Sequence, residues 1–163
     1  MNRMIVAVSL FAAFVGAVAI QGAGAVEGVA QIVLNEVELN PQGRDAGNEW
    51  VELLNLSDEE IDLAGWVLTY SYRAAGEILI SEEPLLLGPG ERYVFAYPRL
   101  MLRNDDKTVI ELRDLDGNVI DKTSVIRDEA NDAQTWQRVP DGGDPVLPDF
   151  WVFGKGTKGK ANE

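Results

Sequence analysis

The sequence predicts an all-β protein built as an antiparallel sandwich or barrel. From residue 31 onward, apolar runs of about four to eight residues recur roughly every ten positions, which is the spacing of short strands. Gly, Pro, Asn and Asp separate these runs, and turns favour these residues. No segment of this part has the spacing of an amphipathic helix. Short strands joined by such turns are typical of antiparallel sandwiches.

Each expected strand follows one apolar run. In order, strands are expected at residues 31–39, 49–55, 66–72, 77–81, 92–97, 108–113, 119–123, 135–138 and 151–153. Asp116-Gly117-Asn118 suits a tight turn, because Gly and Asn tolerate positive φ, and it predicts a hairpin between the strands on either side. Ser57 can cap a single helical turn over residues 57–60. Trp50 and Trp66 are expected to anchor the core.

Residues 1–25 have the pattern of a secretory signal peptide. Arg3 precedes an apolar run over residues 4–20, and small residues at 22–25 precede the expected cleavage before Val26. The alternative is an uncleaved membrane anchor, because residues 4–25 are about long enough to cross a bilayer. In either case we expect an exported protein, secreted or at the cell surface, whose mature chain has no further membrane span.

The residues after the signal suit one domain. We expect a short linker over residues 26–31, the folded domain over 32–154, and a loosely held tail, rich in Gly and Lys, over 155–163. The sequence gives no indication of the oligomeric state.

The composition restricts the classes of function. The chain has a net charge of −13 and contains no Cys and no His. An acidic surface repels nucleic acids and anionic membranes, so we expect no nucleic-acid partner. Without thiols or imidazoles the chain lacks the residues for a Ser-His-Asp triad or a typical zinc site. Carboxylate chemistry and the binding of hard cations remain.

Five acids form the first candidate site: Glu36, Glu38, Asp45, Glu49 and Glu52. Glu36 and Glu38 share one face of a strand. The loop over residues 40–48 can fold Asp45 and Glu49 back towards the end of that strand. Such oxygen ligands suit calcium at extracellular concentration, and calcium is the only cofactor that the sequence suggests. The alternative is that these acids are solvated positions on strands whose other face is buried, or polar caps on a sheet edge.

Two shorter motifs have a functional and a structural interpretation. Asn55-Leu56-Ser57 is an N-glycosylation sequon, but Asn55 and Ser57 can instead make turn hydrogen bonds. Residues 114–118 resemble the start of a calcium loop. However, an EF-hand needs Gly and Glu where this chain has Val119 and Val125, so a hairpin turn is expected there.

Catalysis is not expected from this composition. A glycosidase needs a pair of carboxylates in a cleft, and no pair here differs from an ordinary acidic surface. Lys155, Lys158 and Lys160 give the tail a local positive charge, but three lysines are too few to indicate a nucleic-acid site.

The order of the motifs resembles that of the lamin tail domain family, in the form found in exported archaeal and bacterial proteins. The matching segments are residues 34–38 (LNEVE), 48–55 (NEWVELLN), 61–68 (IDLAGWVL), 87–91 (LGPGE), 106–121 with its central VIEL and DG, 136–142 (WQRVPDG) and 156–162. In the last segment the family usually has Thr-Pro-Gly followed by Asn, and Lys158 stands in place of the proline.

The resemblance implies an immunoglobulin-like antiparallel β-sandwich without catalytic machinery. Members of the family are binding or scaffolding modules and are often attached to extracellular nucleases or hydrolases. We therefore expect a non-catalytic module that recognises a protein or a cell surface. Loops 40–48 and 131–150 are the segments expected to meet partners. A calcium-stabilised adhesion module is the alternative, and an accessory part of an extracellular hydrolase is a second one.

Overall fold

The computed structural model describes residues 31–72, 74–99, 102–104, 107–143 and 151–163. The expected signal peptide, and all but the last residue of the expected linker, lie outside these residues. Every strand pairing within the sheets is antiparallel, and the described residues contain no helix. No helix in this part of the chain is therefore long and apolar enough to cross a membrane.

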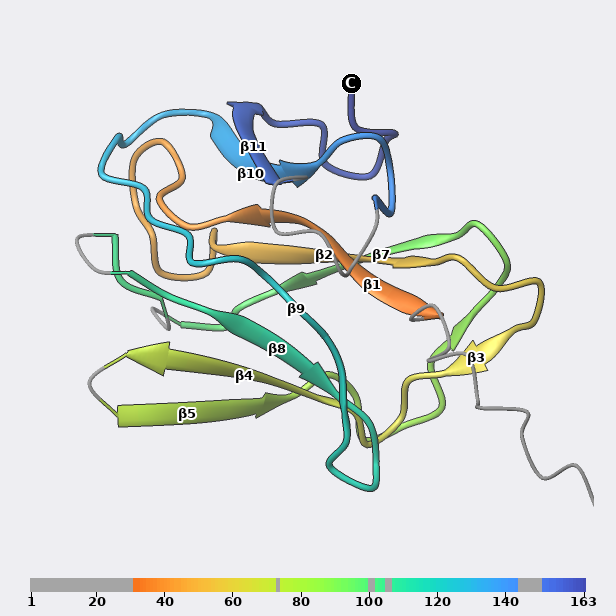
Figure 1. The fold of residues 1–163 in the computed structure, drawn as a ribbon. Helices are drawn as coiled ribbons and strands as arrows, with labels where there is room; N and C mark the ends of the chain where they lie inside the picture. The colour runs from red at the N-terminus through yellow and green to blue at the C-terminus, as the bar shows by residue number, and fades with distance from the viewer. Residues whose placement is uncertain (1–30, 73, 100–101, 105–106, 144–150) are drawn as a thin grey trace, which may run out of the picture.

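Two sheets form the layers of a sandwich (Figure 1). The five-stranded sheet has the order β11 (Trp151–Lys155), β10 (Gln134–Arg138), β1 (Ile32–Glu38), β2 (Trp50–Asn55) and β7 (Arg92–Ala96). The four-stranded sheet has the order β5 (Ala74–Leu79), β4 (Val67–Tyr72), β8 (Ile110–Arg113) and β9 (Val119–Lys122). The two-residue strands β3 (Ile61–Asp62) and β6 (Leu86–Leu87) pair with each other at one end. The predicted all-β, immunoglobulin-like sandwich is confirmed.

The expected strands are present with small shifts at their ends. β8 and β9 form the predicted hairpin. The expected strand over 77–81 begins earlier, at Ala74. One prediction is wrong, because residues 57–59 form bends and no helical turn starts at Ser57. Strands β3 and β6 were not predicted, because they are too short to show as apolar runs.

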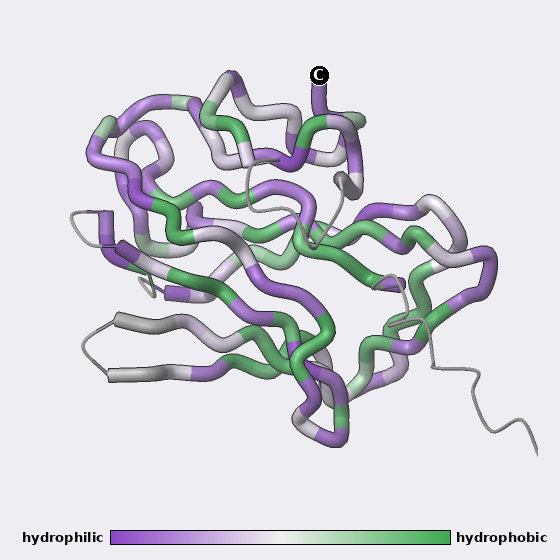
Figure 2. Tube along the Cα trace, in the orientation of Figure 1, coloured by the Kyte–Doolittle hydropathy of each residue, from purple (hydrophilic) through white to green (hydrophobic). Residues whose placement is uncertain are grey.

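The core lies between the two sheets. It includes Leu34 and Val37 of β1, Leu53 of β2, and Leu68 and Ile110 of the opposite sheet, all 0% exposed. Each such side chain contributes about 1.5–3 kcal/mol when fully buried. Figure 2 shows hydrophobic stretches along the strands and mainly hydrophilic residues in the loops.

A β-bulge in β1 breaks the simple alternation of inward and outward side chains. The register with β2 shifts between Leu34 and Glu36, so Asn35 is the extra residue. Leu34 and Val37 therefore both face the core, although they are three residues apart. Asn35 and Glu36 between them both lie on the outer face of the sheet.

A buried ion pair ties the two sheets together. Arg138 of β10 donates from Nη2 to both carboxylate oxygens of Asp121 on β9, at 2.7 Å each. The bulge strand takes part, because Leu34 N donates to Asp121 Oδ2 at 2.7 Å and Leu34 O accepts from Arg138 Nε at 2.7 Å. The Arg138 guanidinium lies 5.0 Å from the Trp151 ring centroid. Arg138 thus holds β1, β9 and β11 in one arrangement.

Candidate interaction surface

Two of the predicted site acids lie directly opposite each other on the outer face of the five-stranded sheet. Glu36 of β1 pairs in register with Glu52 of β2, and both are 0% exposed. Like charges placed directly opposite each other destabilise a sheet, and buried carboxylates need hydrogen-bond donors. The outer face must therefore be covered by a segment that supplies donors.

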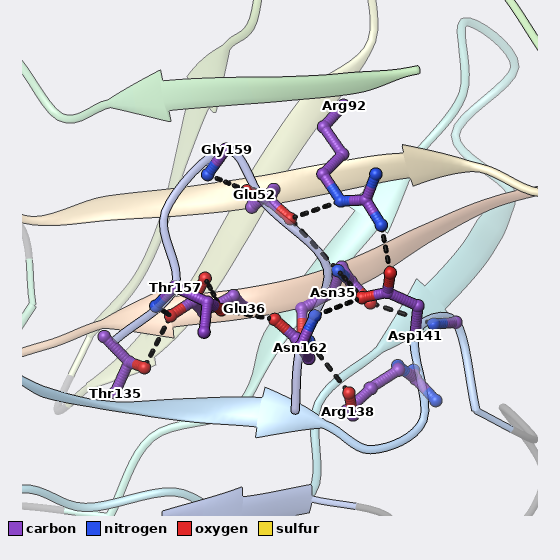
Figure 3. Close-up of polar contacts among 11 residues, drawn as sticks. Asn35, Glu36, Glu52, Arg92, Thr135, Arg138, Asp141, Thr157, Gly159 and Asn162 are labelled. Carbon is purple, nitrogen blue, oxygen red and sulfur yellow. Dashed lines mark hydrogen bonds and ion pairs between the residues drawn. The ribbon is translucent and has the colours of Figure 1, made fainter. Parts of the chain in front are cut away.

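The C-terminal segment supplies them (Figure 3). Glu36 Oε1 accepts from Thr157 N at 2.7 Å and from Thr135 Oγ1 at 2.6 Å, and Glu36 Oε2 accepts from Thr157 Oγ1 at 3.0 Å. Glu52 Oε2 accepts from Gly159 N at 2.7 Å. Both carboxylates are therefore capped in part by residues more than 100 positions downstream.

Asn162 fixes the far end of this segment. Its Nδ2 donates to the carbonyls of Asn35 at 3.0 Å and Arg138 at 2.8 Å. Its backbone N donates to Asp141 Oδ1 at 2.7 Å, and its Oδ1 lies 2.7 Å from Thr157 Oγ1, whose single hydroxyl hydrogen it shares with Glu36 Oε2. The expectation of a loosely held tail is wrong, because the segment carries donors that the buried carboxylates and carbonyls of the sheet require.

The turn that begins at Thr157 explains how the chain reaches Glu52. Lys160 N donates to Thr157 O at 3.0 Å, and Gly159 has a φ of +76°. These features are typical of a type II turn, which needs Gly at its third position and accepts Pro or another residue at its second. Lys158 occupies that second position, so the turn forms without the proline that the family usually has.

A further ion pair closes the network on the β7 side. Arg92 Nε lies 3.4 Å from Glu52 Oε1, and the Arg92 guanidinium pairs with Asp141. Asn35 Nδ2 donates to Glu52 Oε1 at 3.0 Å and to Asp141 Oδ1 at 3.1 Å. Burial raises the pKa of Glu52, while the hydrogen bonds from Asn35 and Gly159 act in the opposite direction.

The other three predicted acids have different surroundings. Glu38 is 5% exposed, and burial raises its pKa to about 7, with the negative charges of Asp128 and Asp132 acting in the same direction. Glu49 is 0% exposed, and its Oε2 accepts from Leu102 N at 3.3 Å. The Oδ2 of Asp45 accepts a hydrogen bond from Nδ2 of Asn104, in the loop that follows β7, at 2.9 Å.

The five acids do not gather into one cage. Across the described residues, no group of three or more acidic side chains is placed to hold a metal ion. The alternative of solvated outward positions is wrong for four of them, because Glu36, Glu38, Glu49 and Glu52 are buried. Their hydrogen bonds give them a structural role, and calcium binding stays a prediction that only a solution experiment tests.

Asn55 is also used structurally. It is 0% exposed, and its Nδ2 donates to the carbonyls of Glu59 at 2.7 Å and Leu87 at 2.8 Å. Its Oδ1 accepts from Ser57 N and Ser57 Oγ. Glycan attachment at Nδ2 would need this turn to open, so the structure supports the turn interpretation for the folded domain.

The acidic loop between β8 and β9 is a hairpin turn. Asp114 Oδ1 accepts from the backbone N–H groups of Asp116 at 3.0 Å and Asn118 at 2.8 Å. The side-chain amide of Asn118 donates to Asp114 Oδ2 at 2.9 Å and lowers the pKa of that carboxyl. These bonds close the loop without a cation.

A groove of about 570 Å³ borders the C-terminal segment. Its floor consists of Gln137, Val152 and Gly154 on β10 and β11, and residues 156–163 form much of its wall. The three lysines named above, Lys155, Lys158 and Lys160, line it. We call this feature the lysine groove.

The comparisons with known proteins identify the family. The model of the lamin tail domain family matches residues 25–127. The chain belongs to the lamin tail domain family. No curated protein matches the chain. Strands β10 and β11 and the capping C-terminal segment of this lamin tail domain lie beyond the matched residues, although β10 pairs directly with β1.

Sequence reasoning missed the residues that complete the network of this lamin tail domain: Asn35, Arg92, Asp121, Thr135, Arg138, Asp141, Thr157, Gly159 and Asn162. One local signal was present, because Asn35 and Glu36 place two adjacent polar residues between the apolar Leu34 and Val37, and that pattern indicates a bulge. The donors on residues 157–162 gave no such signal, since a Gly- and Lys-rich segment is also typical of a free tail.

Proposed function

We propose that this lamin tail domain is an exported, non-catalytic module that recognises another protein at or beyond the cell surface. Its family is one of immunoglobulin-like binding or structural domains. Export is supported by the charged start, the apolar run and the small residues of segment 1–25.

The non-catalytic part of the proposal rests on how the adjacent acids are used. Glu36 and Glu52 lie directly opposite each other on neighbouring strands, and both are fully buried beneath the C-terminal segment. A general acid or base must reach the substrate proton within hydrogen-bond distance. Hydrogen bonds to Thr157 and Gly159 occupy the oxygens that would do so.

Recognition is left to exposed loops and to the lysine groove. Residues 42–44 and 47–48 of the first predicted partner loop are exposed, and so is Asn131 of the second. Residues 144–150 of the second loop lie outside the described part of the chain. A rigid sandwich that presents loops in this way is a common arrangement in binding domains.

Two measurements test the proposal. The full chain is produced in a bacterial host that exports proteins, and the intact mass of the exported product is measured. The exported product is expected to start at Val26. Full-length protein in the membrane fraction would mean that residues 1–25 stay attached as an anchor. Retention of the protein in the cytoplasm would contradict export.

Recognition is tested by site-specific photo-crosslinking on intact producing cells. A photoreactive residue replaces Gln42 in the first loop or Val152 in the groove. Leu115, which is 73% exposed on the hairpin turn, serves as the control position. Adducts from Gln42 or Val152 and none from Leu115 are expected. The absence of adducts from both test positions would contradict the recognition role.

A further inference from the structure

Three of the five lysines of this acidic protein lie together at one place on its surface. The chain has a net charge of −13 and five lysines, of which Lys155, Lys158 and Lys160 line the lysine groove. All three are exposed, and none forms an ion pair within the described part of the chain. Their ammonium groups are therefore available to an external anion.

The floor of the groove combines one exposed apolar side chain with open space. Val152 on the edge strand β11 is 49% exposed. A Cβ added at Gly154 would meet no atom within 4 Å. Between the lysines there is therefore room for an apolar side chain to pack on Val152.

The wall of the groove is fixed before any ligand arrives. Thr157 and Gly159 donate to buried Glu36 and Glu52, and Asn162 is anchored to the sheet. Lys158 Nζ lies 4.9 Å from the centroid of the Trp50 ring, which positions this lysine. Binding to a wall already ordered in this way avoids the entropic cost of ordering a tail.

A second groove, of about 660 Å³, differs in charge. It lies along β4 and β8 and is lined by Thr69, Glu77, Glu111 and Arg113 among others. Its arginine forms an ion pair with Glu111. That groove is thus lined by two acids and one arginine, whereas the lysine groove is lined by three lysines and one acid, Glu163.

We propose that the lysine groove binds a short acidic segment of a partner protein, in which carboxylates alternate with an apolar side chain. The carboxylates meet the lysines, and the apolar side chain packs on Val152. A long polyanion such as a sulfated polysaccharide fits less well, because the remaining acidic surface repels it and because it has no apolar side chain to pack on Val152. This inference rests on the proposed recognition function and specifies the partner of one surface.

The test uses the full chain, as processed by the exporting host, and a fluorescein-labelled hexapeptide of alternating Glu and Val. Fluorescence anisotropy measures binding at low and at physiological salt. Lys155→Gln with Lys160→Gln is the first variant, and Lys158 is kept because it contacts Trp50. Lys107→Gln with Lys122→Gln removes the same charge from exposed positions outside the groove and is the matched control.

The first double variant is expected to weaken binding by roughly five- to tenfold, near the middle of the about 2- to 30-fold range that two exposed ion pairs of about 0.2–1 kcal/mol each would give. The control is expected to stay within about twofold of the unmodified protein. Gly154→Leu fills the groove without changing charge, and it is expected to weaken binding as well. All variants should keep the melting temperature, because the changed positions are exposed or open.

Three results would overturn the inference: an equal loss in the lysine control, unchanged binding by Gly154→Leu, or tighter binding of a heparin hexasaccharide than of the peptide. If the Lys155→Gln, Lys160→Gln variant has a lower melting temperature, its weaker binding could come from loss of structure. The binding measured with Gly154→Leu then decides whether the inference holds. Failure here is distinguishable from failure of the proposed function, because cleavage at Val26 and crosslinking through Gln42 do not depend on the groove.

Discussion

The carboxyl of Glu38 should make this domain less stable as the pH rises. Glu38 lies at the end of β1, is 5% exposed, and accepts one hydrogen bond from Asn40 N at 3.2 Å. Burial, with smaller contributions from the negative charges of Asp128 and Asp132, raises its pKa from 4.5 to about 7. The neutral form is therefore favoured in the folded protein, whereas the unfolded chain ionises near pH 4.5.

The sign and size of the effect follow from linkage. A raised carboxyl pKa contributes stability that is fully present below pH 4.5 and is lost as the pH rises through about 7. A rise from 4.5 to about 7 corresponds to about 3 kcal/mol of unfolding free energy. Burial also raises the pKa values of Glu52 and Asp128, so the unmodified protein should lose stability over this range from more than one group.

Glu38→Gln isolates the contribution of this residue. Gln keeps the shape of the protonated carboxyl and cannot ionise, so the variant should be more stable than the unmodified protein at pH 8, by up to about 3 kcal/mol, and similar to it at pH 5. Urea unfolding followed by tryptophan fluorescence at pH 5, 6, 7 and 8 measures the difference. Glu60→Gln, at an exposed position, is the matched control and should give a constant difference. A Glu38→Gln curve that runs parallel to the unmodified curve from pH 5 to 8 would refute the reasoning.

Three other predictions concern the C-terminal segment and the acids. Asn162→Ala removes two donors to buried carbonyls and should cost about 2–4 kcal/mol in urea unfolding; a cost below about 0.5 kcal/mol would show that the segment is not anchored. Lys158→Pro should keep the turn, since Pro suits the second position of a type II turn, and should raise the free energy of unfolding by about 0.4–1 kcal/mol. Loss of the contact between Lys158 and Trp50 reduces this gain. A large loss of stability in the same assay would mean that the turn has a different geometry. Melting temperatures should agree in calcium and in sodium chloride of equal ionic strength, because no acidic group is arranged for a metal among the described residues; a calcium-specific rise, abolished by Glu36→Gln with Glu49→Gln, would contradict this.

The strands could be predicted because their signals are local. β2, β7, β8 and β9 are runs of alternating or continuous apolar residues bounded by turn residues, and the order of these runs also identified the family. β3 and β6 could not be predicted in this way. They are two residues long, and their pairing depends on the loops that bring Ile61 opposite Leu87.

The candidate site was predicted in part and for a different role. Glu36 and Glu52 were singled out as metal ligands, whereas the structure gives them hydrogen-bond partners that lie far along the chain. Thr157 is 121 residues from Glu36, and Gly159 is 107 residues from Glu52. Such pairings depend on the folded topology, and a pattern read within a short window does not contain them. A segment judged by composition alone was therefore mistaken for a free tail.

The anchoring of residues 157–162 also sets an order of events during synthesis. Asn35 and Asn162 are 127 residues apart, so the carboxylates on the outer face of β1 and β2 have no cap until nearly all of the described chain has been made. Folding that depends on such distant contacts is slow to begin, because a large loop must close first. The outer face of the five-stranded sheet is therefore complete only when residues 157–162 have docked on it. The segment 157–162, which stabilises the finished domain, thereby also delays the completion of folding.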